Sequence, residues 1–226
     1  MDETSAQESD TTLPPLDAAE ARILGCLVEK AAITPEVYPL TLNALVAACN
    51  QKTSREPVMN LEPGAVGHAL NELERRSLVK IAPTSQRALR YEHRFDTVYG
   101  TTARQRAVLC ALLLRGPQTL SELHTRTDRL ADFPSIEDLR DTLDRLIQRE
   151  PAAYVIRLGR GPGQREDRYM HLLGGPVDAE AFASAVPAAP SSRSGAGERI
   201  DQLEAEIAEL RAEIAELRQR LDAAGA

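Results

Sequence analysis

An unbroken polar run at positions 50–56, NQKTSRE, holds the side chains of this chain best suited to binding an anion. Its candidate binding residues are Gln51, Lys52, Ser54 and Arg55. Amide, ammonium, hydroxyl and guanidinium donors of this kind can hold a phosphate or an acidic partner. The alternative is an internal role, in which Arg55 pairs with Glu56 while Asn50 and Thr53 cap helix ends. Two helices can be joined without an all-polar run, so we favour a binding role.

A second set of candidate residues follows one face of the helix predicted over residues 63–76. Its members are His68, Asn71 and Arg75. Asn and Arg pair with adenine and guanine edges, so this face could read DNA in the major groove. Glu72 and Glu74 lie close by and would repel phosphate. The helix predicted over 135–149 is more acidic on its outer side, and we expect it to face a protein or solvent.

Two predicted hairpins are rich in basic residues. The first carries Lys80, Arg87, Arg90 and Arg94, and the second carries Arg157, Arg160, Arg165 and Arg168. Glycines at 159, 161 and 163 would let the second hairpin lie close to a phosphate strand. In the alternative, these cations solvate the hairpin edges and block edge-to-edge pairing. We give the two interpretations equal weight.

The elements that position these residues recur in the same order. The first set is a helix capped by Asp17, a short helix capped by Thr41, a helix over 63–76 and strands over 78–81 and 89–95. The second set is a helix over 102–115, a short helix over 120–127, a helix over 135–149 and strands over 154–158 and 168–173. Three helices followed by a hairpin is the order of a winged helix. The sequence therefore predicts a mainly α fold with small β-hairpins (α+β), with tandem winged-helix domains at 17–100 and 101–174.

The two ends of the chain differ from its middle. Residues 1–16 carry four acids and no base, and we expect a disordered acidic arm. Residues 175–197 are rich in Gly, Pro, Ala and Ser, which is typical of a flexible linker. Residues 198–224 have the apolar spacing of a coiled-coil helix.

The predicted coiled coil has apolar residues that alternate by three and four. They are Ile200, Leu203, Ile207, Leu210, Ile214, Leu217 and Leu221. Isoleucine at a positions with leucine at d positions favours a parallel two-stranded coil, so we expect a homodimer. The alternative is a single amphipathic helix packed against its own domain.

Charge and composition bound the classes of partner. The net charge of −7 belongs to the ends, because residues 17–174 carry 20 acids and 22 bases. A near-neutral middle neither demands nor excludes nucleic acid. No apolar run approaches the length that spans a membrane, and the acidic N-terminus is the reverse of a signal peptide. We therefore expect a cytoplasmic protein with no membrane partner.

Catalytic and metal-binding motifs are absent from the sequence. The four histidines are scattered, and there is no HExxH, GxSxG or Cys/His pairing at metal-ligand spacing. Cys26, Cys49 and Cys110 each fall on an apolar helical stripe, so we expect buried thiols in a reducing compartment. The sequence predicts no enzyme, no metal and no cofactor.

Several stretches carry a family resemblance. They are RILGCLVEKAAITPEVYPLTLNAL at 22–45, ACNQKTSREPVMNL at 48–61, LLLRGPQTLSEL at 112–123 and RYMHLL at 168–173. Together they resemble the YceH-type family of uncharacterised bacterial proteins, over roughly residues 17–174. The resemblance implies two winged helices in tandem and assigns no activity.

Two functions fit these observations. The first is a dimeric winged-helix DNA-binding protein, which could act as a transcriptional regulator. It would contact duplex DNA through the polar run, the face of helix 63–76 and the hairpin arginines. This hypothesis rests on analogy of fold, which is a weak warrant. The second is a protein-interaction module that does not bind DNA directly, which the neutral middle and the acidic helix 135–149 suit equally well.

Overall fold

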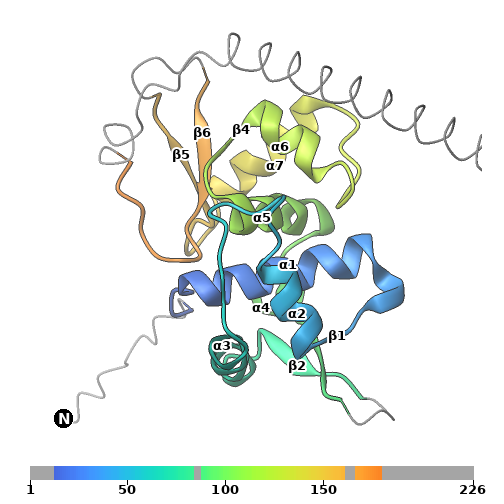
Figure 1. Ribbon diagram of the computed structural model, residues 1–226. Coiled ribbons are helices and arrows are strands. Elements are labelled where there is room, and N and C mark those ends of the chain that lie inside the picture. Colours follow the sequence, from blue (N-terminus) through green and yellow to red (C-terminus); the bar gives the residue numbers. More distant parts are fainter. Residues whose placement is uncertain (1–12, 84–87, 161–165, 180–226) are drawn as a thin grey trace, which may run out of the picture.

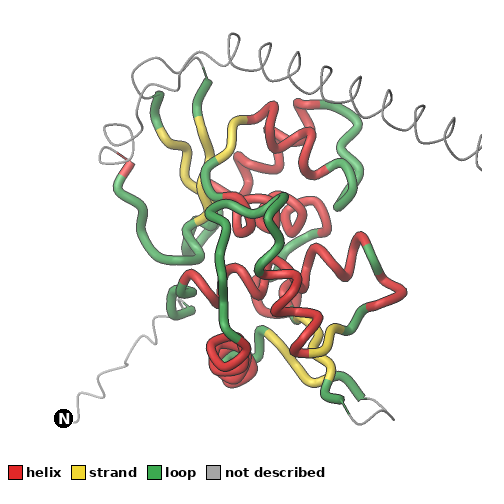
Figure 2. Tube along the Cα trace, viewed as in Figure 1, coloured by secondary structure: helices red, strands yellow, loops and turns green. Residues whose placement is uncertain are grey.

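The computed structural model describes residues 13–83, 88–160 and 166–179, which form a mixed α+β structure with two small antiparallel sheets (Figures 1 and 2). The first set of elements is α1 (Ala18–Ile33), the 3-10 turn η1 (Pro35–Val37), β1 (Leu40–Thr41), α2 (Leu42–Cys49), α3 (Pro63–Arg75), β2 (Val79–Ile81), β3 (Arg90–His93) and α4 (Phe95–Tyr99). The second set is α5 (Ala103–Arg115), β4 (Gln118–Thr119), α6 (Leu120–Thr127), α7 (Ile136–Ile147), β5 (Val155–Leu158) and β6 (Arg168–His171). We call these sets the first unit and the second unit.

Helix caps predicted from the sequence are confirmed. Asp17 forms a capping box with Glu20 at the start of α1. Thr41 caps α2 and Ser135 caps α7, each by accepting a backbone N–H three residues on. Thr102, which the sequence assigned to the helix itself, caps α5 in the same way. Such local hydrogen bonds satisfy the free N–H groups of a helix end, so a short stretch of sequence is enough to fix them.

Each sheet contains a strand that the sequence did not predict. The orders are β1-β3-β2 and β4-β6-β5, and all pairs are antiparallel. The two-residue strands β1 and β4 are too short to show an alternating pattern. The predicted strand 89–95 is also wrong at its end, because Phe95 begins helix α4 and is fully buried.

The same residues occupy equivalent places in the two sheets. The matched positions are Pro39 and Pro117, Thr41 and Thr119, Leu42 and Leu120, Leu45 and Leu123, Arg90 and Arg168, Tyr91 and Tyr169, and His93 and His171. Arg90 donates to the carbonyl of Pro39 at 2.8 Å, and Arg168 donates to that of Pro117 at 3.0 Å. The repeat therefore extends to individual side-chain contacts.

Helices α1 and α5 lie in the middle of the molecule, between the two sheets (Figure 1). Residues 20–28 of α1 and 107–114 of α5 are buried without interruption, as expected for helices covered on every side. At their crossing, a Cβ atom on Gly25 would lie 2.9 Å from Cδ2 of Leu114. Because the core is continuous across this contact, the units are packed together.

The last residues assigned to the acidic arm belong to the packed structure. Leu16 is 4% exposed, and its N–H donates to the carbonyl of Leu173 at 2.8 Å. Arg76 donates to the carbonyls of Pro14 and Pro15. Other predictions lie outside the described residues: the arm over 1–12, Arg87, Arg165, the linker from 180 and the whole coiled-coil seam.

Candidate binding surfaces

The polar run is part of a long loop that joins α2 to α3 and reaches the second unit (Figure 2). The N–H of Glu56 donates to the carbonyl of Leu114 at the end of α5, at 2.8 Å. The loop thus contacts both units, and its position is fixed by the arginines described next.

Arg55 is enclosed in the structure. Its side chain is 0% exposed, and its two terminal nitrogens donate to the two carboxylate oxygens of Glu29 at 3.0 and 2.5 Å. Its Nε donates to the carbonyl of Ala48 at 3.0 Å. The geometry fits the internal alternative, with Glu29 as the partner in place of Glu56. We therefore leave Arg55 out of any proposed contact surface.

Arg22 of α1 is a second buried arginine, and it contacts the same loop. It is 2% exposed and donates to the carbonyls of Cys49 at 3.1 Å and Pro57 at 2.7 Å. Arg22 and Arg55 thus hold the last carbonyls of α2, where the helix dipole is negative. Asn50 adds a reciprocal pair of bonds with the backbone of Leu61, at 2.9 and 2.7 Å. Sequence reasoning missed Arg22, because a lone arginine on an apolar helix gives no local sign of its partner.

Few donors of the polar run remain available. Lys52 and Ser54 are exposed, and Gln51 is half-buried. Ser54 has a φ of +61°, a left-handed conformation that is uncommon outside glycine. The exposed tip therefore offers one cation rather than the two that the sequence indicated.

The exposed face of α3 presents the predicted residues together. The side chain of His68 is 79% exposed, and Asn71 is exposed one turn further on. Arg75 is exposed as well, but it is paired with Glu72 on the same helix. His68 and Asn71 are thus the uncommitted members of this set.

Three of the predicted hairpin cations pair with an acid of their own hairpin, and Arg168 pairs with Glu122 of α6. Lys80 of β2 pairs with Glu92 of β3 at 2.5 Å. Arg157 and Arg160 both bind Asp167, with Nε to carboxylate distances of 2.8 and 3.1 Å. These hydrogen bonds, chiefly the one from Arg157, lower the pKa of Asp167, so the carboxylate stays ionised.

A groove of about 570 Å³ lies between α6, α7 and the second hairpin. Its lining residues are Leu120, Ser121, Ile136, Arg140, Asp144, Arg157, Arg160, Glu166, Asp167 and Tyr169. Three arginines face three carboxylates, so the rim is charge-balanced. Ile136, at the start of α7, is only partly buried and helps to form this groove.

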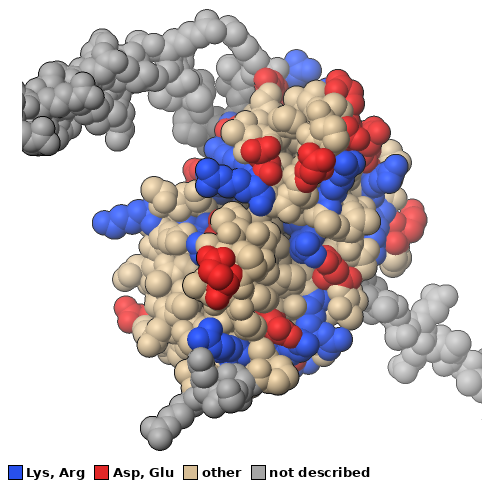
Figure 3. Space-filling model, turned by 90° about the vertical axis from the view of Figure 1, so that its right-hand side faces the viewer, with Lys and Arg blue, Asp and Glu red and all other residues tan. Residues whose placement is uncertain are grey.

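One face of the molecule can be inspected directly. Figure 3 shows Lys and Arg side chains interspersed with Asp and Glu, without a continuous basic strip across this face. A continuous basic strip is the usual electrostatic feature of a protein surface that binds duplex DNA.

The three cysteines are free and buried. The thiols of Cys26 and Cys49 are hydrogen-bonded to each other, and this bond together with burial raises the pKa of Cys49. Burial also raises the pKa of Cys110 well above its ordinary value. Among the described residues, no group of three or more His, Cys, Asp or Glu side chains is placed to hold a metal ion. In the same part of the chain, no helix combines the length and apolar character needed to cross a membrane.

The fold and these surfaces define a two-unit α+β protein with an internal repeat. The family model described as "Protein of unknown function, DUF480" matches residues 16–164, and the chain belongs to this family. The match covers the first unit and the second as far as the residues before β6, which is consistent with the resemblance seen in the sequence; the YceH name itself is not confirmed.

Similar proteins from three bacteria span most of the chain. A UPF0502 protein of Xanthomonas axonopodis pv. citri is 53% identical over 225 residues, which cover 96% of this chain and 100% of the relative. A UPF0502 protein of Pseudomonas paraeruginosa is 55% identical over 195 residues, 86% of each chain. One from Stenotrophomonas maltophilia is 51% identical over 201 residues, covering 87% of this chain and 91% of the relative. None of these names assigns an activity.

Proposed function

We propose that this protein is a non-enzymatic, cytoplasmic interaction module of two tandem winged helices, at 17–100 and 101–174, that binds a protein partner through the groove of its second unit. The element order of each unit supports the winged-helix assignment. Each has helix, strand, helix, helix and a hairpin, and the strand before the second helix pairs with the last strand of the hairpin.

The pairing of Arg157 and Arg160 with Asp167 carries this proposal. In a winged helix the third helix and the hairpin are the usual contact surfaces for DNA. Here the hairpin arginines share a carboxylate, and Asp144 adds a second acid from α7. A phosphate strand would meet those acids, whereas a polypeptide with charges of both signs would find matched partners.

The groove also has the composition of a protein-binding site. Leu120, Ile136 and Tyr169 supply apolar surface at its lining, and charged side chains form the rest. Protein interfaces typically combine an apolar centre, often with an aromatic residue, and a polar rim. We expect a short partner segment whose apolar side chains enter the groove between the charges.

Partner capture with matched variants tests this function. The full chain carrying a photocrosslinker at Ser121 would be used as bait in a lysate of the native host. Arg140→Glu reverses a charge in the groove, and Arg145→Glu reverses an exposed charge elsewhere on α7. We expect one crosslinked partner that is lost with Arg140→Glu and kept with Arg145→Glu. Equal capture by both variants would exclude the groove.

A second candidate function is DNA binding through α3. The observation that favours it is the exposed pair His68 and Asn71. Within residues 13–83, 88–160 and 166–179, the side chains of this pair have no partner apart from a 4.0 Å approach of His68 to Glu72. Lys52 and Ser54 of the loop would extend this surface. Loss of duplex binding in an Asn71→Ala variant, with binding unchanged in Arg140→Glu, would assign DNA to the first unit.

We also propose homodimerisation through the heptad residues between Ile200 and Leu221. Leu210→Glu places a charge in the middle of that apolar seam and should convert the dimer to a monomer in sedimentation experiments. A variant that still sediments as a dimer would move the dimer contact to the two units.

A further inference from the structure

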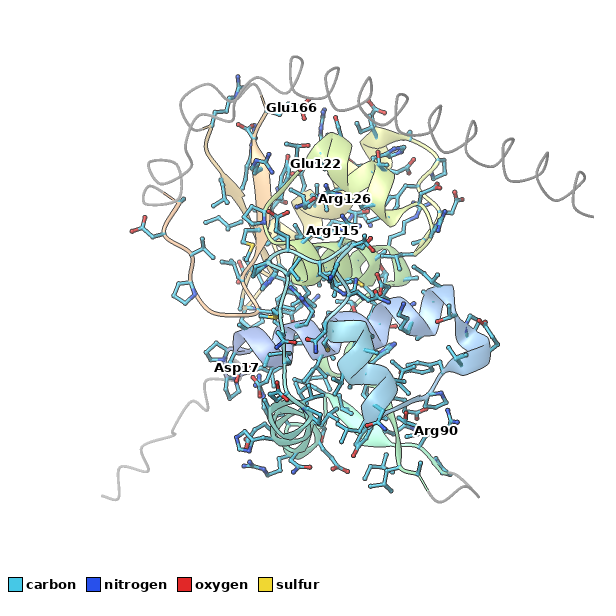
Figure 4. All side chains as sticks on the ribbon, viewed as in Figure 1. Asp17, Arg90, Arg115, Glu122, Arg126 and Glu166 are labelled. Atoms are coloured by element: carbon cyan, nitrogen blue, oxygen red, sulfur yellow. The ribbon has the colours of Figure 1, made fainter. Side chains whose placement is uncertain are left out.

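A corner of polar side chains lies where the C-terminal end of α5 meets β4 and α6. Arg115, Glu122 and Arg126 lie together there, as the labels in Figure 4 show. Gln118 forms the turn between them by donating to the carbonyls of Arg115 at 3.2 Å and Pro117 at 2.8 Å. This corner is separate from the groove, whose lining residues do not include any of these four.

The first unit has apolar residues at three of the four positions. Matched by the strand register and by the capping threonines, the counterparts of Gln118, Glu122 and Arg126 are Leu40, Ala44 and Ala48. The fold therefore does not require polar side chains at these positions. Their presence in the second unit alone calls for another reason.

The corner has more positive charge than its own carboxylate can balance. The carboxylate of Glu122 forms ion pairs with Arg168 at 3.2 Å and Arg126 at 3.8 Å. It also accepts a hydrogen bond from the N–H of Thr119 at 2.9 Å. Arg115 makes no hydrogen bond or ion pair through its side chain with any residue that the structure describes. Burial lowers the pKa of Arg115, and the nearby charge of Arg126 lowers it further.

Two buried polar atoms at the corner have no partner within the described residues. They are Nη1 of Arg126 and Oε1 of Gln118. Gln118 is 2% exposed, and its free Oε1 is an acceptor, which a hydroxyl donor of a ligand could satisfy and a bare oxyanion could not. A buried guanidinium N–H without an acceptor is costly, and a bound oxyanion would satisfy it.

We propose that Arg115 and Arg126 bind a dianionic tetrahedral oxyanion, either inorganic phosphate or the phosphate of a small monoester. Two guanidinium groups supply forked donors that match phosphate oxygens, and a dianion balances the pair, which a single carboxylate does not. The nearest outside acids are Glu29, held by Arg55, and the exposed Glu56. This site is independent of the groove and of the partner proposed for it.

Titration calorimetry with inorganic phosphate, at ionic strength held constant with chloride, tests the site on the full chain. Glycerol phosphate tests whether a monoester is bound, and acetate tests for a carboxylate. Arg115→Gln and Arg126→Gln should each weaken phosphate binding at least about tenfold, since each removes charge-assisted hydrogen bonds. Arg129→Gln is the matched control, because Arg129 is an exposed arginine just beyond the end of α6.

The outcomes separate clearly. Phosphate binding that is lost in both corner variants and kept in Arg129→Gln supports the site, and tighter binding of glycerol phosphate would identify a monoester as the ligand. Equal binding of acetate, no phosphate binding in the wild type, or the same loss in Arg129→Gln would overturn it. Arg126→Ala introduces the residue found at the equivalent position of the first unit, Ala48. Its unfolding midpoint, measured in chloride without phosphate, shows whether a loss of binding comes from a loss of folding.

Discussion

The two units share a fold and several contacts but use their charged residues differently. In the first unit Arg22 and Arg55 are buried and hold the end of α2 and the loop that follows it. In the second unit Arg157 and Arg160 are exposed and lie on the rim of a groove. Arginines that look alike in the sequence are therefore buried structural residues in one unit and exposed residues at a groove in the other.

The corner after the first helix of each unit shows the same division. Where the first unit has Leu40 and Ala48, the second has Gln118 and Arg126. The two units of one chain can thus be compared with each other. Where one unit has a polar residue and the other has an apolar residue at the equivalent position, the fold does not need the polar one.

The largest expected effect comes from breaking the buried ion pair of the first unit. Arg55→Met leaves Glu29 without its partner and should lower the free energy of unfolding by about 3–5 kcal/mol. Arg157→Met removes an exposed pair of the second unit and should cost less than about 1 kcal/mol. Urea unfolding of both variants measures the difference. Similar losses in the two would break the contrast between buried and exposed arginines.

The equivalent histidines His93 and His171 should make stability depend on pH. Burial is the main cause that lowers the pKa of each to about 4. Both are neutral when folded, so the unfolded chain takes up more protons once the pH falls below about 6.5. The contribution of each neutral histidine to the free energy of unfolding is therefore fully present above that pH and declines toward pH 4. The loss at pH 5 is about 2 kcal/mol per histidine.

Single-histidine variants sharpen this comparison of the two sheets. Nδ1 of His93 accepts from the N–H of Phe95 at 3.3 Å, whereas Nδ1 of His171 has no partner within the described residues. His171→Leu should therefore reduce the pH dependence with little loss of stability at pH 8. His93→Leu should also reduce the pH dependence, but it leaves the N–H of Phe95 without its acceptor, at a cost of about 1–3 kcal/mol. A pH profile unchanged by either substitution would contradict the role of burial.

The contact between the units gives a smaller effect. A side chain at Gly25 would press against Leu113 and Leu114 of α5. We expect Gly25→Leu to lower the free energy of unfolding by about 1–3 kcal/mol, because the crossing has no room for it. Unchanged stability in thermal unfolding would mean that α1 and α5 are not closely packed.

Gly67 on α3 provides the opposite case and the smallest effect. A Cβ atom there would meet nothing within 4 Å. Gly67→Ala should raise the free energy of unfolding by about 0.5–1 kcal/mol, because alanine is the better helix former. A loss of stability would show that the exposed face of α3 is covered in the native protein.

Local features of the fold were predictable from the sequence, and long-range contacts were not. Asp17 and Thr41 cap helices through bonds to residues three positions away, so a short window reveals them. Strand β1 is two residues long and forms only by pairing with β3, so no local pattern announces it.

The fate of the candidate site residues follows the same rule. Arg55 looked like a surface ligand because its neighbours are polar, but its partner Glu29 lies on another helix. Asp167 forms ion pairs with both Arg157 and Arg160, and the sequence alone does not show that these three side chains meet. The matched RYEH and RYMH strands were the available signal, since their shared residues would have revealed the equivalent positions in the two units.

Fluorescence anisotropy with a mixed-sequence DNA duplex tests the central claim most directly, that the hairpin cations are committed to acids of their own unit. Binding would be measured from about 50 mM to about 200 mM salt, a range in which phosphate contacts weaken strongly. The account predicts weak or no binding at the lower salt and no change in salt dependence with Arg160→Ala. Tight binding that falls steeply with salt, with a slope reduced by Arg160→Ala, would contradict it and establish the second hairpin as a DNA contact.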